Sequence, residues 1–162
     1  MKKIKLSQRK YALVDDEDYE YLNQWKWCVC KRKKTSYAIG LIKINGCRTQ
    51  VLMHRLIMNT PPIMETDHID HDGLNNQKSN LRNCTKQQNA WNRQATGSSK
   101  YRGVSVYFVT HKHCISKYIA AHISVNSKSV HLGHFKTEED AARAFDQAAK
   151  KHHGEFANLN FK

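Results

Sequence analysis

An acid, a base and amide side chains lie close together in residues 67–89, where Asp67 and His68 are adjacent and Asn80 and Asn89 follow. Hydrolysis of a phosphodiester needs a base that takes a proton from water and a cation that stabilises the leaving oxygen. Hard divalent ions bind oxygen ligands, often only one or two of them from the protein, and Asp67 and Asn89 can supply these. Histidine, with an ordinary pKa of about 6.5, is the natural base. These residues predict a hydrolytic metal centre that acts on phosphates, with His68 as its base.

Three neighbouring side chains compete with these ligands for the metal, namely Asp70, His71 and Asp72. Each of them also suits a solvated loop. A zinc site made of His68, His71 and Cys84 is a further alternative, although it lacks the paired-ligand spacing of zinc sites.

Asp67 and His68 can serve one centre only if their strand ends or twists there, because adjacent residues of a regular strand point to opposite faces. The polar loop at 70–76 is consistent with such an end. Within it, Asn75 and Asn76 are interpreted as loop residues that tolerate a left-handed backbone and hydrogen-bond their own backbone.

The chain is strongly basic, with 27 Lys and Arg against 14 Asp and Glu and a formal net charge of +13. Such an excess attracts a polyanion and makes its binding sensitive to salt, so we expect nucleic acid as the partner. A membrane surface is disfavoured, because no basic amphipathic helix with a large apolar face is visible. Four basic side chains are candidates for phosphate contacts: Lys31, Arg32, Arg93 and Lys100.

The sequence contains no apolar run close to the roughly 20 residues that cross a bilayer. Its basic start has no apolar segment behind it and is not a signal peptide. The five cysteines form no CxxC pair, which argues against a disulfide framework. We therefore expect a cytoplasmic protein that is not secreted and needs no small-molecule organic cofactor.

The first part of the chain is predicted to be rich in strands. Alternating or short apolar runs indicate strands at 3–6, 11–14, 25–30, 37–44, 49–53 and 64–69 and helices at 16–23 and 79–92. The basic run Lys31–Lys34 is the expected tip of a hairpin, and Asn45-Gly46 is a turn signal.

The tail alternates apolar and polar residues, which predicts three short antiparallel strands near 104–107, 119–125 and 130–135. Thr137 is the expected cap of a helix that Gly154 ends. The apolar face of this helix has helical spacing and consists of Ala141, Ala144, Phe145 and Ala148. The helix covers one sheet face, and the free polar face fits a DNA major groove.

Residues 92–100 have no periodicity and are rich in small polar side chains, as in a linker. We expect a first domain at 1–94 with its core at about 50–94, a linker at 95–100 and a second domain at 101–162.

Five short motifs follow one another in the first domain: MHRLIM at 53–58, DHID at 67–70, GLNN at 73–76, SNLR at 79–82 and QQNAWN at 87–92. Their order resembles the HNH endonucleases, and most closely the homing enzymes of phages and introns. The resemblance implies a ββα-metal fold around one divalent ion per active site, Mg²⁺ or Mn²⁺. It implies His68 as general base, with Asn80 in the catalytic centre as the residue that ties the loop together. It also implies Asp67 and Asn89 as metal ligands, while His54 either braces the hairpin or contacts a phosphate.

The tail carries YRGV at 101–104, HLGHF at 131–135, TEEDAARAFDQAA at 137–149 and GEFANLNF at 154–161. These motifs resemble the plant ethylene-response-factor (Apetala-type) DNA-binding domain. The residues that the resemblance implies as DNA-binding are Arg102, Ser105, Tyr107, His122, Ser124, Ser129 and His131. Plant domains are rich in Arg and Trp at such positions, so the target sequence cannot be transferred.

Together these features predict an α+β protein in which a β-rich N-terminal segment leads into a ββα-metal nuclease motif. A three-stranded antiparallel sheet packed on one helix follows. The predicted function is a metal-dependent, site-preferring DNA endonuclease of the HNH homing type that cuts double-stranded DNA. It would act as a monomer or homodimer, in the host cytosol if phage-encoded.

The alternative is a DNA-binding regulator with an inactive nuclease centre, which the complete set of four centre residues disfavours. An RNA-binding module ranks lower, because only Tyr107 and Tyr118 could stack on bases.

Overall fold

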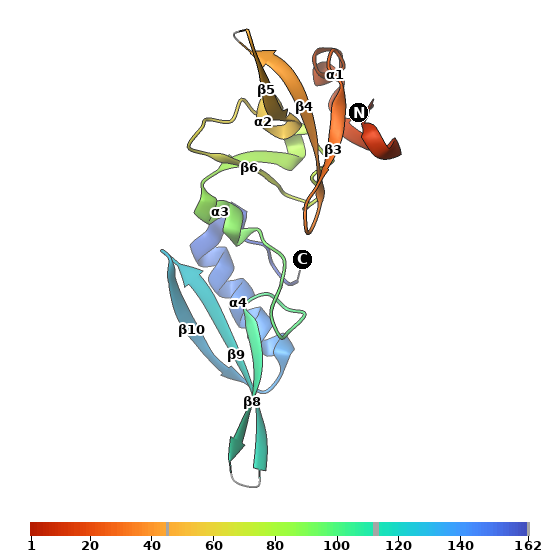
Figure 1. Ribbon diagram of the computed structural model, residues 1–162. Coiled ribbons are helices and arrows are strands. Elements are labelled where there is room, and N and C mark those ends of the chain that lie inside the picture. The colour runs from red at the N-terminus through yellow and green to blue at the C-terminus, as the bar shows by residue number, and fades with distance from the viewer. Residues whose placement is uncertain (45, 112–113, 162) are drawn as a thin grey trace. The chain divides into compact units, whose positions relative to one another are not determined.

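The computed structural model describes residues 1–44, 46–111 and 114–161 (Figure 1). The chain divides into two compact units, Met1–Asn89 and Ala90–Lys162. Both mix helices with small antiparallel sheets, which confirms the predicted α+β class. No helix in the described ranges is long and apolar enough to cross a membrane. The predicted turn at Asn45-Gly46 includes Asn45, which lies outside the described residues.

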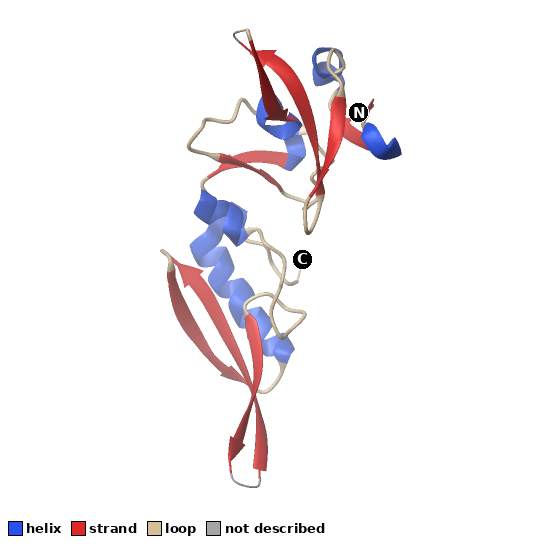
Figure 2. Cartoon of the chain, in the orientation of Figure 1, coloured by secondary structure: helices blue, strands red, loops and turns tan. Residues whose placement is uncertain are grey.

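Unit 1 begins with two small antiparallel sheets (Figure 2). Residues of both sheets belong to one hydrophobic core. Their strands are β1 (Lys2–Lys5), β2 (Tyr11–Val14), β3 (Trp27–Lys31), β4 (Ser36–Ile44) and β5 (Cys47–Leu52). The helices are α1 (Asp16–Leu22), which was predicted, and α2 (Met53–Ile57), which forms from the apolar stretch before Pro61. Alternating burial along β4 places Ala38 and Ile42 in the core.

The last part of unit 1 is a strand pair followed by a helix. β6 (Glu65–His68) pairs antiparallel with β7 (Leu81–Cys84), and α3 (Lys86–Trp91), which runs past the end of unit 1, follows. The loop between the strands ends in the short turn η2 (Lys78–Asn80). This is the ββα order that the resemblance implied.

The helix predicted within 79–92 forms only in the second half of that range, as α3. Leu81 and Cys84 are buried within β7, and the helix starts only after Thr85. There the Thr85 hydroxyl accepts a hydrogen bond from the Gln88 amide at 3.2 Å, and the Gln88 side chain accepts one from the Thr85 amide at 2.8 Å. This reciprocal pair is a capping box, so local capping and cross-strand pairing both oppose an earlier helix start.

Unit 2 is the predicted three-stranded sheet with one helix on its face (Figure 1). The sheet order is β10-β9-β8, with β8 (Val104–His111), β9 (Cys114–Val125) and β10 (Lys128–Phe135). The helix α4 (Glu138–His153) is followed by the turn η3 (Gly154–Phe156). Thr137 caps α4 as predicted, since its side chain accepts a hydrogen bond from the Asp140 amide at 3.1 Å.

The buried face of α4 differs slightly from the predicted one. Ala141, Ala142, Phe145 and Ala149 are buried, whereas the predicted Ala144 and Ala148 are half-buried. Ala141 and Phe145 lie in the clusters that hold the inward residues of β9, such as Ile119 and Ile123. The buried face is rotated by about one residue from the predicted one, and Gly103 leaves room for the Phe145 ring against the backbone.

Candidate active site

His68 is the last residue of β6 and is 6% exposed. The strand β6 therefore ends at His68, which is the condition under which Asp67 and His68 can serve one centre. The rings of His54 and Tyr37 lie 4.9 and 5.7 Å from its ring, and its Nε2 atom lies 3.5 Å from Oδ1 of Asn76. Burial lowers the pKa of His68 below its ordinary value, although Asn76 and nearby carboxylates, led by Asp70, act in the opposite sense. Near neutral pH the ring is an imidazole that can accept a proton.

Asp67 is 6% exposed and lies opposite Arg82 in the β6–β7 pair. Nε and Nη2 of Arg82 donate to Oδ2 of Asp67 at 3.0 and 2.8 Å. The arginine holds the orientation of the carboxylate and offsets the cost of burying its charge. Sequence reasoning missed Arg82, because only the register of the two strands brings it to Asp67.

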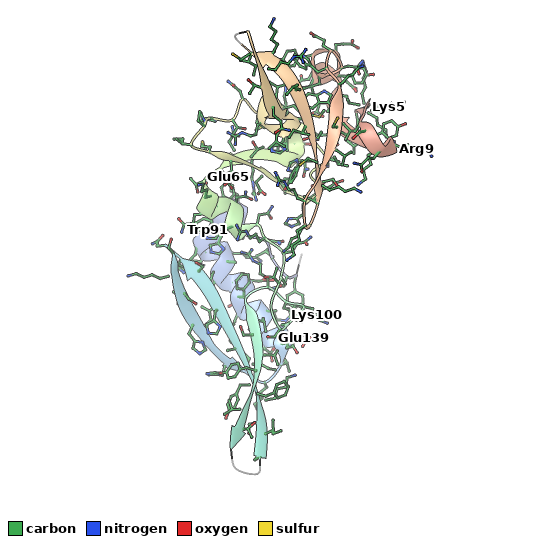
Figure 3. The ribbon with its side chains drawn as sticks, in the orientation of Figure 1. Lys5, Arg9, Glu65, Trp91, Lys100 and Glu139 are labelled. Carbon is green, nitrogen blue, oxygen red and sulfur yellow. The ribbon has the colours of Figure 1, made fainter. Side chains whose placement is uncertain are left out.

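Asn89 is brought to β6 by Glu65 (labelled in Figure 3). Nδ2 of Asn89 donates to Oε2 of Glu65 at 2.6 Å. Because the amide nitrogen faces Glu65, the amide oxygen is the atom that Asn89 presents as an acceptor on its other side. Glu65 is a second residue that sequence reasoning missed.

The predicted metal ligands fit a hard divalent ion in their chemistry. A carboxylate from Asp67 and an amide oxygen from Asn89 match the oxygen ligands of Mg²⁺. Within the described ranges, no three His, Cys, Asp or Glu side chains gather in a way that could hold a metal, but a site with two protein oxygens does not require such a group. A zinc site with His68, His71 and Cys84 gains no support, and burial raises the pKa of the Cys84 thiol to about 11.

Asn80 joins the two ends of the loop between β6 and β7. Its Oδ1 accepts from the amide of Asp70 at 3.0 Å, and its Nδ2 donates to Oδ1 of Asp70 at 2.8 Å and to the carbonyl of Asn75 at 2.9 Å. Burial acts to raise the pKa of Asp70, but hydrogen bonds from Asn75, Asp72 and Asn80 outweigh it and lower that pKa.

The carboxylates of Asp70 and Asp72, which compete with the predicted ligands for the metal, accept hydrogen bonds within the same loop. Asp70 accepts hydrogen bonds from Asn75 and the Asp72 amide, and Asp72 accepts one from the Leu74 amide. The left-handed residue of the loop is His71, with a φ of 68°, rather than Asn75 or Asn76. Asn76 lies in the loop and hydrogen-bonds the local backbone as predicted, since its Nδ2 donates to the Leu74 carbonyl at 3.2 Å, and it is in addition fully buried.

The predicted basic hairpin tip lies beside this loop. The amide of Gly73 donates to the Thr35 hydroxyl at 3.0 Å, and a Cβ on Gly73 would lie 2.5 Å from the Ser36 carbonyl oxygen. Lys31 and Arg32 are exposed next to this contact. Their predicted phosphate contacts remain a prediction.

His54 is 5% exposed, and its Nδ1 atom has no hydrogen-bond partner among the described residues. Burial, followed by the charges of His68 and Arg55, lowers the pKa of His54 to about 3. A neutral, buried ring against His68 fits a bracing role.

In unit 2, six of the predicted DNA-binding residues lie on β8, β9 and β10, at partly or fully exposed positions: Ser105, Tyr107, His122, Ser124, Ser129 and His131. Ser129 pairs with Ser124 and His131 with His122 in the β9–β10 register. Nδ1 of His131 lies 3.0 Å from Nε2 of His122. The Tyr107 ring stacks on Tyr118 at 5.6 Å.

Arg102 differs from the other six because its guanidinium is engaged within unit 2. It donates to the carbonyl of Ala90 at 3.2 Å and to that of Trp91, and it lies 5.4 Å from the Phe145 ring. Burial, and then the charge of Arg93, lowers its pKa. A bidentate contact to guanine, the usual base contact of an arginine in the major groove, would require Arg102 to release these carbonyls. Arg93 and Lys100 are exposed, and Lys100 lies over the Tyr101 ring at 4.9 Å.

The paired strands, their loop and the following helix thus carry all four residues predicted for a nuclease centre. Over 151 residues the chain is 30% identical to an uncharacterized HNH endonuclease of Acanthamoeba polyphaga mimivirus, covering 93% of this chain and 74% of that protein. The chain belongs to the HNH endonuclease family.

A second relative matches in a shorter region. Over 64 residues the chain is 44% identical to an AP2-like ethylene-responsive transcription factor of Arabidopsis thaliana, covering 40% of this chain and 12% of that protein. No family model and no solved structure matches the chain.

Proposed function

We propose that this protein is a metal-dependent, site-preferring endonuclease of the HNH homing type that hydrolyses double-stranded DNA. The observation that carries the proposal is the environment of His68. The ring is buried at the end of β6, directly after the buried Asp67, in a chain that belongs to the HNH family.

In the proposed reaction His68 takes a proton from water, whose oxygen forms a bond to phosphorus while the bond to the 3′ oxygen breaks. Asp67 and Asn89 would hold one Mg²⁺ or Mn²⁺, which when bound supplies Lewis-acid stabilisation of the phosphate and of the leaving oxygen. Arg82 and Glu65 orient these two ligands through the hydrogen bonds described above. Such supporting contacts set ligand geometry at metal sites.

We assign DNA binding to the outer face of the unit 2 sheet. The sequences of β8, β9 and β10 contain no Asp or Glu, so this face does not repel phosphates. The match to a plant transcription factor supports the assignment, as does the net charge of +13. One centre cuts one strand at a time, so cleavage of both strands would require a homodimer or two events.

The test uses the purified full chain and supercoiled plasmid. With Mg²⁺ or Mn²⁺ we expect the supercoiled plasmid to be converted to nicked circles. A chelator should prevent this conversion. Gel-shift binding to the same DNA without nicking in either metal would contradict the proposal and favour the regulator with an inactive centre.

A further inference from the structure

We infer that Asn76 is a positioning residue that fixes the tautomer of His68, with the hydrogen on Nε2 and the basic lone pair on Nδ1. The inference rests on the proposed function for its catalytic meaning, but the tautomer itself follows from the hydrogen bonds around the Asn76 amide. Sequence reasoning placed Asn76 among the ordinary loop residues.

The Asn76 side chain is fully buried, so both ends of its amide require partners. Its Nδ2 donates to the carbonyl of Leu74 at 3.2 Å. A carbonyl can only accept, so this contact fixes which end of the amide is the nitrogen. The other end, Oδ1, therefore faces Nε2 of His68 at 3.5 Å.

An amide oxygen cannot donate a hydrogen bond, so Nε2 must carry the hydrogen. The opposite tautomer would place the Nε2 lone pair against Oδ1 in a buried site, where two acceptors repel each other. In a neutral imidazole with hydrogen on Nε2, the basic lone pair is on Nδ1. The water proton in the proposed reaction therefore goes to Nδ1.

The distance of 3.5 Å is long for a hydrogen bond, as catalytic contacts often are before substrate binds. Once Nδ1 has taken a proton, the ring is positive and its Nε2–H becomes a stronger donor to Oδ1. Asn76 thus stabilises the protonated ring that the reaction forms, in addition to setting the tautomer.

Asn76 is held in place by β2 of the N-terminal hairpin. The amide of Asn76 donates to the carbonyl of Leu13 at 2.8 Å, and the amide of Leu13 donates to the carbonyl of Leu74 at 2.8 Å. The flanking residues Ala12 and Val14 lie in the core of unit 1. The β-rich start of the chain therefore contributes to the centre by fixing the position of Asn76.

The test measures the tautomer directly by long-range ¹H–¹⁵N NMR of the His68 ring at pH 8, where the ring is neutral. In the wild type we expect the Nε2–H pattern. In Asn76→Leu, which has nearly the same shape but no acceptor, we expect a shift toward a tautomer mixture.

Single-turnover cleavage of plasmid gives the second readout. Asn76→Leu should be about 10–100-fold slower, as for other groups that orient a functional side chain, with DNA affinity unchanged. Gln77→Ala is the matched control, because it removes a loop contact to Asp15 without touching His68. It should leave both the tautomer and the rate as in the wild type.

An Nδ1–H pattern in the wild type would overturn the inference, and this result needs neither a variant nor cleavage. The inference would also be overturned if a folded Asn76→Leu protein kept both the wild-type tautomer and the wild-type cleavage rate. If the wild type shows the Nε2–H pattern but never cleaves DNA, the proposed function fails while the tautomer assignment stands.

Discussion

At the scale of single residues, His68 is suited to its proposed role by its surroundings. An exposed histidine would be partly protonated near pH 7, whereas burial lowers the pKa of this one. The rings of Tyr37 and His54 lie against it. Burial, and then the charge of Asp67, raises the pKa of Tyr37, so that phenol stays neutral beside the base.

His54 makes the stability of unit 1 depend on pH. Its pKa is lowered to about 3 in the folded protein, but in the unfolded chain it takes a proton near pH 6.5. Between about pH 3 and about pH 6.5, His54 is neutral in the folded state and protonated in the unfolded state. The contribution of His54 to the free energy of unfolding is therefore fully present above about pH 6.5 and falls as the pH drops. The loss is at most about 1.4 kcal/mol per pH unit.

This pH dependence is tested by measuring the free energy of unfolding in urea for the wild type and for His54→Phe, at pH 7 and at pH 5. The stability of the wild type relative to the variant should fall by about 2 kcal/mol between these pH values. If the difference in stability between the wild type and His54→Phe is the same at both pH values, folded His54 takes up the proton and the prediction fails.

Residue types predicted only part of the site. Asp67 and His68 stood out because they are adjacent and chemically paired, and Asn89 because its amide oxygen suits a hard ion, whereas the role of Asn80 came from the resemblance. Arg82 and Glu65 were not visible, since the first depends on strand register and the second on the hydrogen bond that joins Asn89 of α3 to β6. Asn76 looked like any loop asparagine because the contact that holds it in place is with Leu13, which is distant in sequence.

At the scale of elements, unit 2 depends on a glycine just before β8. Gly103 has a φ of 75°, and a Cβ there would overlap the Phe145 ring of α4. Gly103→Ala should destabilise unit 2 by at least about 2 kcal/mol, because left-handed strain and overpacking each cost about 1–3 kcal/mol.

Gly97→Ala is the control for this substitution, since a Cβ on Gly97 would have the Val104 carbonyl oxygen as its nearest neighbour, at 3.8 Å. Urea unfolding followed by far-ultraviolet circular dichroism should separate the two variants. Equal stabilities would contradict the close approach of α4 to the backbone at Gly103.

The elements that sequence predicted best are those with local signals. Alternation along β9 and the cap at Thr137 are both confirmed, because each depends on neighbouring residues. The helix predicted within 79–92 forms only from Lys86, and Leu81 and Cys84 belong to β7 although their spacing of three also fits a helix face. Only pairing with β6 decides for a strand there.

At the scale of the whole molecule, two units with separate cores carry different parts of the proposed activity. Unit 1 would hold the centre, and the sheet of unit 2 would bind duplex DNA. With a net charge of +13, affinity for DNA should fall steeply as salt increases. Cleavage and binding are therefore comparable only at one salt concentration.

The most direct test of the account is His68→Ala, measured against the wild type at the same salt for duplex binding and for single-turnover cleavage with Mg²⁺. We expect cleavage to slow by about 10²–10⁴-fold, the usual contribution of a general base, with affinity within a few-fold of the wild type because the removed side chain is buried. A variant that cleaves as fast as the wild type would contradict the account.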